Sequence, residues 1–368
     1  MNVLRFAHFA LISALLCPAS LIADPLRPTL RVAADGMSRD TARAGISAGD
    51  GVATLAGQSE PRFTLKPALD TTAFVGHRGT VESVAFAPSG EHLATAGHDG
   101  AIRIWTLNGA AVGEPFWGHE GRINIVAYSP SGDHILSGSN DNTVRLWQRN
   151  GESAATIFTG HSDWVLSAAF SPSGQHIVSA SADGTVRLWS LEGEPLIAPI
   201  KGHQGRVFSV AFSPSGKHIV SAGQDRSVRL WTLSGEPVGQ PFVGHGNWAL
   251  SVAFSPSGEH LVSGDVNGKL QMWTRTGKAL PRFSQGHADW IESIAFSPSG
   301  ALIASASDDG SVRLWNADGT PAAEALRPGG ELVLDVTFSP NGQLLATSGE
   351  KGAVDLWRLA PLSAVEAR

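Results

Sequence analysis

A repeat of 42 residues runs through most of the chain and limits its possible folds more than any other feature. The unit is clearest at residues 160–189, which read GHSDWVLSAAFSPSGQHIVSASADGTVRLW. Each copy but the last opens on Gly-His, and the histidines recur every 42 residues from His77 to His287. Each copy ends on a tryptophan, and these recur at the same interval from Trp105 to Trp357. A fixed period of about 40–45 residues with these ends is typical of β-propeller blades. The seven tryptophans therefore predict seven blades.

Four short strands are expected in each copy of the repeat. Alternating apolar residues mark the strands, while Asp-Gly pairs and Pro-containing turns separate them. In the third copy the expected strands are 164–170, 177–181, 185–189 and, near the end of the unit, 196–200. Strands this short, with two half-apolar faces, need a neighbouring sheet on each side. The predicted fold is therefore all-β, a seven-bladed β-propeller with four antiparallel strands per blade.

The repeat resembles that of the WD40 family over roughly residues 66–361. In that family a polar tetrad links the opening histidine, a Ser or Thr on the second strand, the aspartate of the following hairpin and the closing tryptophan. The matching residues of the third copy are His161, Ser179, Asp183 and Trp189. Such groups can satisfy one another's hydrogen bonds inside a blade. The resemblance implies a structural role for them, and the uniform FSPSG-type copies resemble bacterial members of the family.

Two copies depart from this tetrad. The fifth has Asn267 at the position of the hairpin aspartate, and the seventh has Gly329 and Lys351 at the histidine and aspartate positions. The seventh blade is therefore expected to be the least stable. It also lacks a fourth strand of its own, because only 11 residues follow Trp357. The resemblance implies that an N-terminal strand within Pro67–Val75 completes this last blade and closes the ring.

The N-terminal part of the chain lacks the repeat. Its first 23 residues combine a short basic start, an apolar run and small residues, which resembles a secretory signal peptide. The stretch that follows shows neither a helical nor a strand period, so it is expected to be flexible. The predicted domains are a signal peptide at 1–23, a flexible leader at 24–65, the propeller at 66–361 and a C-terminal tail at 362–368.

This interpretation predicts an exported protein, periplasmic or extracellular, with no stable membrane span after signal cleavage. The alternatives are a cytoplasmic protein, or one that stays tethered to a membrane through an uncleaved N-terminus.

Composition argues against several classes of function. With 27 Lys and Arg against 33 Asp and Glu, the formal net charge is −6, so nucleic-acid binding is not expected. The one cysteine, Cys17, excludes a disulfide framework and a thiolate metal site. Most of the 13 histidines follow the 42-residue period and lie on different blades, so no metal ion or cofactor is expected. The chain is predicted to be a monomer, not an enzyme, and to have no catalytic residues.

The candidate binding residues come from the positions at which the copies differ. Three residues after the opening histidine the chain has Trp164, Trp248, Trp290, Arg122 and Arg206, and five residues after it Leu166, Phe208 and Leu250. In the WD40 family such positions line the top face around the central channel. Trp and Arg dominate protein interfaces, so an aromatic surface over blades three to six is predicted. The alternative is that these tryptophans pack between blades. Trp117, outside this set, is expected to be a packing residue.

The predicted function is a non-catalytic scaffold that binds a protein or peptide on the top face. A propeller that binds a carbohydrate or small ligand is the alternative, since tryptophan faces also stack on sugars. A hydrolase or lyase at the channel mouth is a further alternative. Its candidate residues are Glu82, His98, Glu292, Asp308 and Glu350, from blades one, six and seven.

Overall fold

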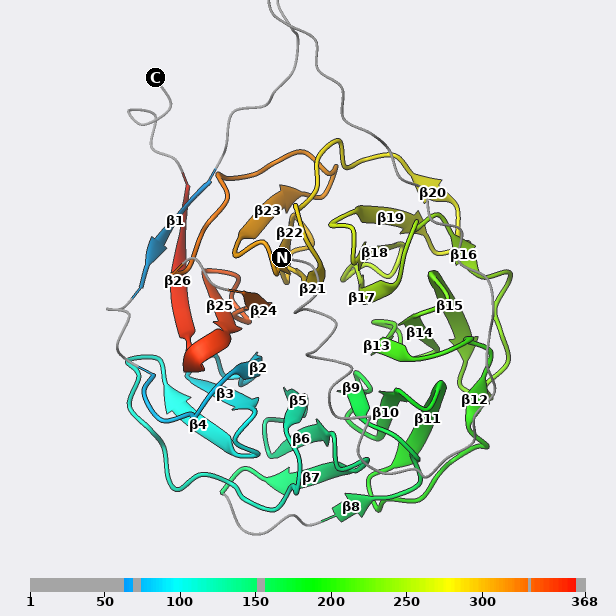
Figure 1. The fold of residues 1–368 in the computed structure, drawn as a ribbon, viewed down its shortest axis with the longest axis horizontal. Helices are drawn as coiled ribbons and strands as arrows, with labels where there is room; N and C mark the ends of the chain where they lie inside the picture. The colour runs from blue at the N-terminus through cyan, green and yellow to red at the C-terminus, as the bar shows by residue number, and fades with distance from the viewer. Residues whose placement is uncertain (1–62, 69–73, 151–155, 330–331, 362–368) are drawn as a thin grey trace, which may run out of the picture. The chain divides into compact units, whose positions relative to one another are not determined.

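A computed structural model describes residues 63–68, 74–150, 156–329 and 332–361. Within the unit Leu55–Arg368, the strands form seven small antiparallel sheets arranged in a ring (Figure 1). This confirms the predicted seven-bladed, all-β propeller. The predicted signal peptide at 1–23 and tail at 362–368 lie outside the described residues.

Blades 2 to 5 each contain four strands, and the first strand of each blade is innermost (Figure 1). Blade 2 contains β5 (Ile123–Tyr128), β6 (His134–Ser139), β7 (Val144–Gln148) and β8 (Thr156–Phe158); blade 3 contains β9 (Val165–Phe170), β10 (His176–Ser181), β11 (Thr185–Ser190) and β12 (Ile200–Lys201). Blade 4 contains β13 (Val207–Phe212), β14 (His218–Gly223), β15 (Ser227–Thr232) and β16 (Phe242–Val243); blade 5 contains β17 (Ala249–Phe254), β18 (His260–Asp265), β19 (Leu270–Thr274) and β20 (Ala279–Leu280).

Blades 1 and 6 have three named strands. Blade 1 contains β2 (Val81–Phe86), β3 (His92–Gly97) and β4 (Ile102–Thr106); blade 6 contains β21 (Ile291–Phe296), β22 (Leu302–Ser307) and β23 (Val312–Asn316). The segments that follow their third strands pair with them only through isolated bridges, Trp105–Ala111 and Ile102–Phe116 in blade 1 and Trp315–Pro321 and Val312–Leu326 in blade 6. A fourth segment is thus paired in every blade, and the extent of its pairing differs between blades.

The last blade is completed by the N-terminal strand. It contains β24 (Val333–Phe338), β25 (Leu344–Gly349), the 3-10 turn η1 (Glu350–Gly352) and β26 (Val354–Pro361), and β1 (Phe63–Pro67) pairs antiparallel with β26. The closing strand is expected within Pro67–Val75, but it covers Phe63–Pro67 and shares only Pro67 with that stretch. Phe63 and Leu65 alternate with polar residues and pack against the last blade's core, so these residues belong to the sheet and not to the expected leader.

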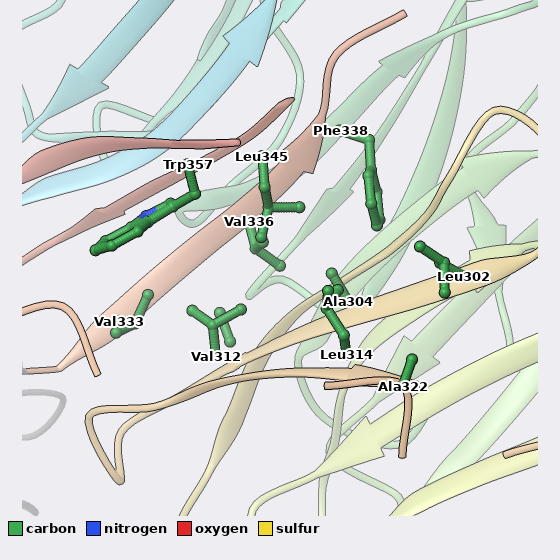
Figure 2. Packing of buried hydrophobic residues seen from close by; sticks show 11 residues of the cluster. Leu302, Ala304, Val312, Leu314, Ala322, Val333, Val336, Phe338, Leu345 and Trp357 are labelled. Atoms are coloured by element: carbon green, nitrogen blue, oxygen red, sulfur yellow. The ribbon is translucent and has the colours of Figure 1, made fainter. Parts of the chain in front are cut away.

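Apolar clusters hold neighbouring blades together. Among the described residues, each of the seven joints between blades has one cluster. At the joint of blades 6 and 7, Leu302 and Leu314 face Val336 and Phe338 (Figure 2). At the joint of blades 7 and 1, Leu356 and its neighbours pack against the core of blade 1. The ring is therefore closed, and no blade buries its apolar faces alone.

A belt of hydrogen bonds between innermost strands reinforces six of the seven joints. A serine Oγ on an innermost strand accepts a backbone N–H from the next blade. The pairs are Ser83–Val126, Ser167–Val210, Ser209–Val252, Ser251–Ile294 and Ser293–Val336.

Blade 7 has Asp335 in place of this serine. Its Oδ2 accepts from the Ser83 hydroxyl and the Val84 N–H, both at 3.0 Å. Its Oδ1 accepts from the Ser293 hydroxyl at 2.7 Å and from the Val336 N–H at 2.8 Å. One carboxylate therefore joins blades 6, 7 and 1 at the closure of the ring.

Candidate functional site

Three variable positions of each blade are held together by backbone hydrogen bonding. In blade 3 they are Trp164, just before the innermost strand, Leu166, within it, and Ala182, just before the hairpin. The N–H of Ala182 donates to the carbonyl oxygen of Trp164 at 2.9 Å. The same bond recurs in the other blades, from His98 to Thr80, Asn140 to Arg122, Gln224 to Arg206, Val266 to Trp248, Asp308 to Trp290 and Glu350 to Leu332.

The variable residue within each innermost strand occupies a β-bulge. In blade 1, Val81 pairs with Gly97 and Ser83 with Ala96, so Glu82 is the extra residue. The corresponding bulge residues are Asn124, Leu166, Phe208, Leu250, Glu292 and Leu334. Bulges re-aim side chains and are common beside functional sites. The variable positions therefore gather where the innermost strands begin, at one end of the ring's centre, and we call this end the rim.

Two arginines contact one tryptophan on the rim. The guanidinium of Arg122 lies 5.8 Å from the Trp164 ring centroid, and that of Arg206 lies 5.4 Å from the same ring. These residues come from blades 2, 3 and 4 and are all partly exposed. Both distances lie within the range of cation–π attraction, so three blades present one joined aromatic and cationic surface.

Three aromatic rings continue this surface over blades 4 to 6. Phe208 stacks on Trp248 with ring centroids 5.8 Å apart, and Trp248 meets Trp290 edge to face at 6.4 Å. All three side chains are partly exposed. We call Arg122, Trp164, Arg206, Phe208, Trp248 and Trp290 together the rim arc.

The two predicted leucines contribute less to this surface. Leu166 is partly exposed, whereas Leu250 is only 7% exposed and belongs to the buried residues. The tryptophans of the rim arc are partly exposed and, like Leu250, are not members of the clusters between blades.

Acidic groups occupy the rim where the arc ends. Glu82 accepts a hydrogen bond from His98 at 2.7 Å and forms an ion pair with Arg122 at 3.5 Å. Burial raises the pKa of Glu292 well above its usual range, and the charges of Asp308 and Glu82 raise it further, while Arg122 opposes them. Blades 1 and 6 thus bring Glu82, Glu292 and Asp308 together, and we call these three the acidic sector. Glu350 lies on the rim of blade 7, at the start of η1.

The tetrad of blade 3 forms the hydrogen-bonded chain that the resemblance implies. His161 Nδ1 lies 2.8 Å from Asp183 Oδ2, and His161 Nε2 lies 2.8 Å from Ser179 Oγ. The Trp189 indole N–H donates to the same Ser179 Oγ at 2.9 Å. A carboxylate only accepts, so Nδ1 carries the proton and Nε2 accepts from the serine hydroxyl. Every group in the chain is satisfied, which supports a structural role.

The tetrad sets the ionisation of both its acidic and its basic member. Burial alone would raise the pKa of Asp99, but the hydrogen bond and charge of His77 and two backbone N–H donors lower it to about 2. Burial lowers the pKa of His119, although Asp141 partly offsets this. His119 is therefore neutral near pH 7, and Asp141 is ionised because, despite burial, hydrogen bonds from His119 and Thr143 lower its pKa below the usual range.

Blade 5 has a complete tetrad despite Asn267. Asp265, two residues earlier, is fully buried, and its Oδ2 lies 3.0 Å from His245 Nδ1. Its Oδ1 accepts the N–H groups of Asn267 and Lys269 at 2.9 and 3.0 Å. The sequence did not predict this substitute, because the carboxylate belongs to a different position of the repeat. In blade 7 only the bond from Trp357 to Thr347 remains, at 3.1 Å.

Trp117 is not the packing residue that was expected. It is 59% exposed, and the Arg103 guanidinium lies 5.8 Å from its ring. It follows Phe116, whose pairing in blade 1 ends after a single bridge, so little of the sheet covers it. Within the described part of the chain, no three His, Cys, Asp or Glu side chains are grouped as metal ligands. The same part contains no helix long and apolar enough to span a membrane.

Two family profiles match the chain across the propeller. Residues 69–106, 112–148 and 152–190 match the WD domain, G-beta repeat. Residues 191–366 match the profile described as IFT122 first beta-propeller. Fold, tetrads and profiles agree that the chain contains WD40 repeats arranged as a seven-bladed β-propeller.

Curated relatives are similar to the chain over 41 residues, about the length of one repeat. Ribosome biogenesis protein erb1 of Aspergillus clavatus is 54% identical there, and those of Chaetomium thermophilum and Botryotinia fuckeliana are each 51% identical. The matched segment is 11% of this chain and 5% of each relative. The chain thus matches only a small fraction of the relatives' length, equivalent to a single blade.

The predicted location is wrong. An exported, periplasmic or extracellular protein is contradicted, because these relatives are eukaryotic ribosome biogenesis proteins. The same organisms give no support to the bacterial assignment. That assignment depended on FSPSG-type turns, which reflect the geometry of a blade and carry no information about the organism.

Proposed function

We propose that this chain is a non-catalytic scaffold that binds a protein or peptide at its rim. The observation that carries the proposal is the rim arc, in which two arginines and four aromatic rings from five consecutive blades form one partly exposed surface. Interface hot spots are enriched in Trp and Arg, and exposed apolar patches rimmed by polar groups are typical of binding sites. The likeness of one segment to proteins of ribosome biogenesis fits a protein-binding role.

The rim arc can be tested by removing its three tryptophans together. The Trp164→Ala, Trp248→Ala, Trp290→Ala variant is expected to fold, because these side chains lie outside the clusters that join the blades. Proteins captured from a cell extract by the purified chain should be depleted at least tenfold, since hot-spot residues each contribute about 2 kcal/mol or more. Quantitative mass spectrometry of the captured proteins measures this.

Trp117→Ala is the matched control, because Trp117 is an exposed tryptophan outside the rim arc. Circular dichroism and thermal unfolding should show that both variants retain the fold. Capture that is unchanged by the triple variant, or lost equally with Trp117→Ala, would contradict the proposal.

The geometry favours a protein over a carbohydrate. A sugar stacks on an open tryptophan face, whereas Trp164 is contacted by two guanidinium groups and Trp248 is stacked on Phe208. Binding of the purified chain to a glycan array would instead favour a carbohydrate ligand.

Two of the residues considered for a hydrolase or lyase, Glu82 and His98, are hydrogen-bonded to each other. The Glu82 carboxylate contacts both His98 and Arg122, and this mutual contact supports a binding or structural role over a catalytic one. The non-catalytic assignment is therefore part of the proposal.

A further inference from the structure

Two asparagines on the rim of blade 2 form a hydrogen-bonded pair that is not part of the rim arc. Asn124 is the bulge residue of β5, and Asn140 directly precedes the hairpin aspartate. No other blade has an amide side chain at both of these positions. Asn124 Nδ2 lies 2.7 Å from Asn140 Oδ1 and 2.7 Å from the backbone carbonyl oxygen of Val165. The pair therefore joins blade 2 to the start of β9 in blade 3.

The contact with Val165 fixes the direction in which both amides point. A carbonyl oxygen only accepts hydrogen bonds, so the Asn124 atom beside it must be the nitrogen. This nitrogen donates one hydrogen to Val165 and the other to the side-chain oxygen of Asn140. Two groups of the pair then remain, the Asn124 oxygen, which is an acceptor, and the Asn140 nitrogen, which carries two donor hydrogens.

These two groups are available to a ligand. Within the described residues, Asn124 Oδ1 accepts no hydrogen bond, Asn140 Nδ2 donates none, and neither atom is buried without a partner. Both side chains are partly exposed. Because Asn124 is already held by both of its hydrogens, little side-chain entropy is lost when its oxygen accepts a further bond. The rim thus presents one acceptor and one donor group to solvent at fixed positions.

The pair lies beside two members of the rim arc. The backbone N–H of Asn140 donates to the carbonyl oxygen of Arg122 at 3.0 Å, and Val165 directly follows Trp164 in the sequence. The Arg122 guanidinium lies 5.8 Å from the Trp164 ring. The amide pair and this cation–π contact therefore belong to the same junction of blades 2 and 3, and a segment bound over Trp164 would pass within reach of both amides.

An acceptor beside a donor is complementary to an amide group, whose N–H donates and whose carbonyl accepts. A carboxylate would leave Asn124 Oδ1 without a donor, and an ammonium group would leave Asn140 Nδ2 without an acceptor. The two groups belong to different side chains, so a ligand with separate donor and acceptor atoms fits them better than a single hydroxyl. Amide groups of this kind occur in the main chain of any peptide and in Asn and Gln side chains.

We propose that Asn124 and Asn140 form an amide-binding subsite of the rim, at which the segment bound by the rim arc places one amide group. Its N–H donates to Asn124 Oδ1, and its carbonyl oxygen accepts from Asn140 Nδ2. The inference rests on the proposed function and adds the chemistry by which one point of the bound segment is recognised.

Peptide display on the purified full-length chain tests the subsite and requires no identified partner. Random peptides would be selected on wild type, and calorimetry would compare the affinity of an enriched peptide for wild type and two variants. Asn140→Asp keeps the oxygen that accepts from Asn124 and replaces the outward donor by an acceptor. Asn124→Leu removes the outward acceptor, and leucine occupies the same bulge at Leu166, Leu250 and Leu334. Each variant should bind roughly three- to tenfold more weakly, the effect expected for one neutral hydrogen bond.

Asn142→Asp is the matched control. Asn142 is a partly exposed asparagine of the same hairpin, so its substitution adds the same charge as Asn140→Asp but leaves both members of the pair in place. This control should bind the peptide as wild type does. Circular dichroism and thermal unfolding should show that all three variants retain the fold.

A double-mutant cycle then identifies the bound amide. Each peptide bond of the enriched peptide would be replaced in turn by an ester, which lacks the N–H, and each Asn or Gln by Leu or Met. One of these replacements should weaken binding to wild type by a similar factor and cost little on Asn124→Leu, because its partner is absent there. A sensitive ester identifies a main-chain amide, and a sensitive Asn or Gln identifies a side-chain amide.

The outcomes separate the two proposals. Binding that is unchanged in Asn140→Asp and Asn124→Leu, or weakened equally in Asn142→Asp, overturns the subsite, and so does the absence of any coupled amide. The proposed function stands in those cases if the peptide still fails to bind the triple tryptophan variant. No enrichment on wild type, or equal binding to the triple variant, overturns the proposed function and the inference with it.

Discussion

Individual residues keep the tetrad complete even where the repeat itself is broken. In blades 2, 3 and 6 a serine precedes the hairpin aspartate by two residues, as Ser181 does Asp183. In blade 5 the order is Asp265 and Asn267, and the carboxylate of Asp265 reaches the same histidine nitrogen. The tetrad needs a carboxylate acceptor beside the histidine Nδ1, and either of two positions of the hairpin can supply it.

This equivalence predicts a rescue between two positions. Asp265→Ser should lower the free energy of unfolding by about 1–3 kcal/mol, because the His245 N–H loses its buried acceptor. Adding Asn267→Asp rebuilds the order of blade 3 and should restore most of that loss. Urea unfolding followed by circular dichroism measures both, with Asn267→Asp alone as the control. A double variant no more stable than Asp265→Ser would show that the two positions are not equivalent.

At the level of elements, the least predictable strand is the one that closes the ring. β1 is paired along its whole length with β26, from Phe63–Pro361 to Pro67–Trp357. Without it, β26 would be an open sheet edge, and such edges promote association with other chains. Blade 7, which the sequence predicts to be the least stable, therefore depends on a strand that precedes blade 1 in the sequence.

Deletion of residues 1–67 should destabilise the propeller, whereas deletion of residues 1–54 should not. The longer deletion removes the backbone ladder of β1 and the packing of Phe63 and Leu65. A loss of about 2 kcal/mol would lower the melting temperature by roughly 3 °C in a domain of about 300 residues. Differential scanning calorimetry measures the shift, and light scattering should detect more association for the longer deletion. Equal melting temperatures for the two deletions would contradict the closing role of β1.

For the molecule as a whole, stability depends on joints between blades. Every joint has an apolar cluster, six of the seven also have a belt contact, and Asp335 concentrates four hydrogen bonds at the point of closure. All four partners are donors, so an ionised carboxylate fits this position better than an amide. Burial raises the pKa of Asp335, although these hydrogen bonds oppose the shift.

Asp335→Asn should therefore lower the free energy of unfolding more than a substitution that removes an ordinary belt contact. Its amide N–H₂ would face donor groups, at an expected cost of about 1–3 kcal/mol. Ser167→Ala removes one belt contact of 3.3 Å between blades 3 and 4 and should cost about 1 kcal/mol or less. Chemical denaturation of both variants measures the difference. Equal losses would mean that the closing joint is no different from the others.

Much of the fold could be predicted from local pattern. In blade 3 the strands β9, β10 and β11 lie within one residue of the expected bounds, because alternation and turn residues act over a few positions. The fourth strand was displaced, since β12 covers only Ile200–Lys201 and its sequence varies most between copies. The prediction for the exposed Trp117 was wrong for the same reason, since its burial depends on how far a short edge strand continues.

The amino-acid sequence alone specifies the number of blades, the strands of each and the positions at which the copies differ, because a 42-residue period repeats local information seven times. That these positions meet in a rim is a property of the folded chain. Bulges and backbone hydrogen bonds bring these positions together within a blade. Closure of the ring sets blade 6 near blade 1, so that the charge of Glu82 raises the pKa of Glu292. Contacts between residues roughly 200 positions apart have no local signature, which is why the charge of the rim becomes visible only in the closed ring.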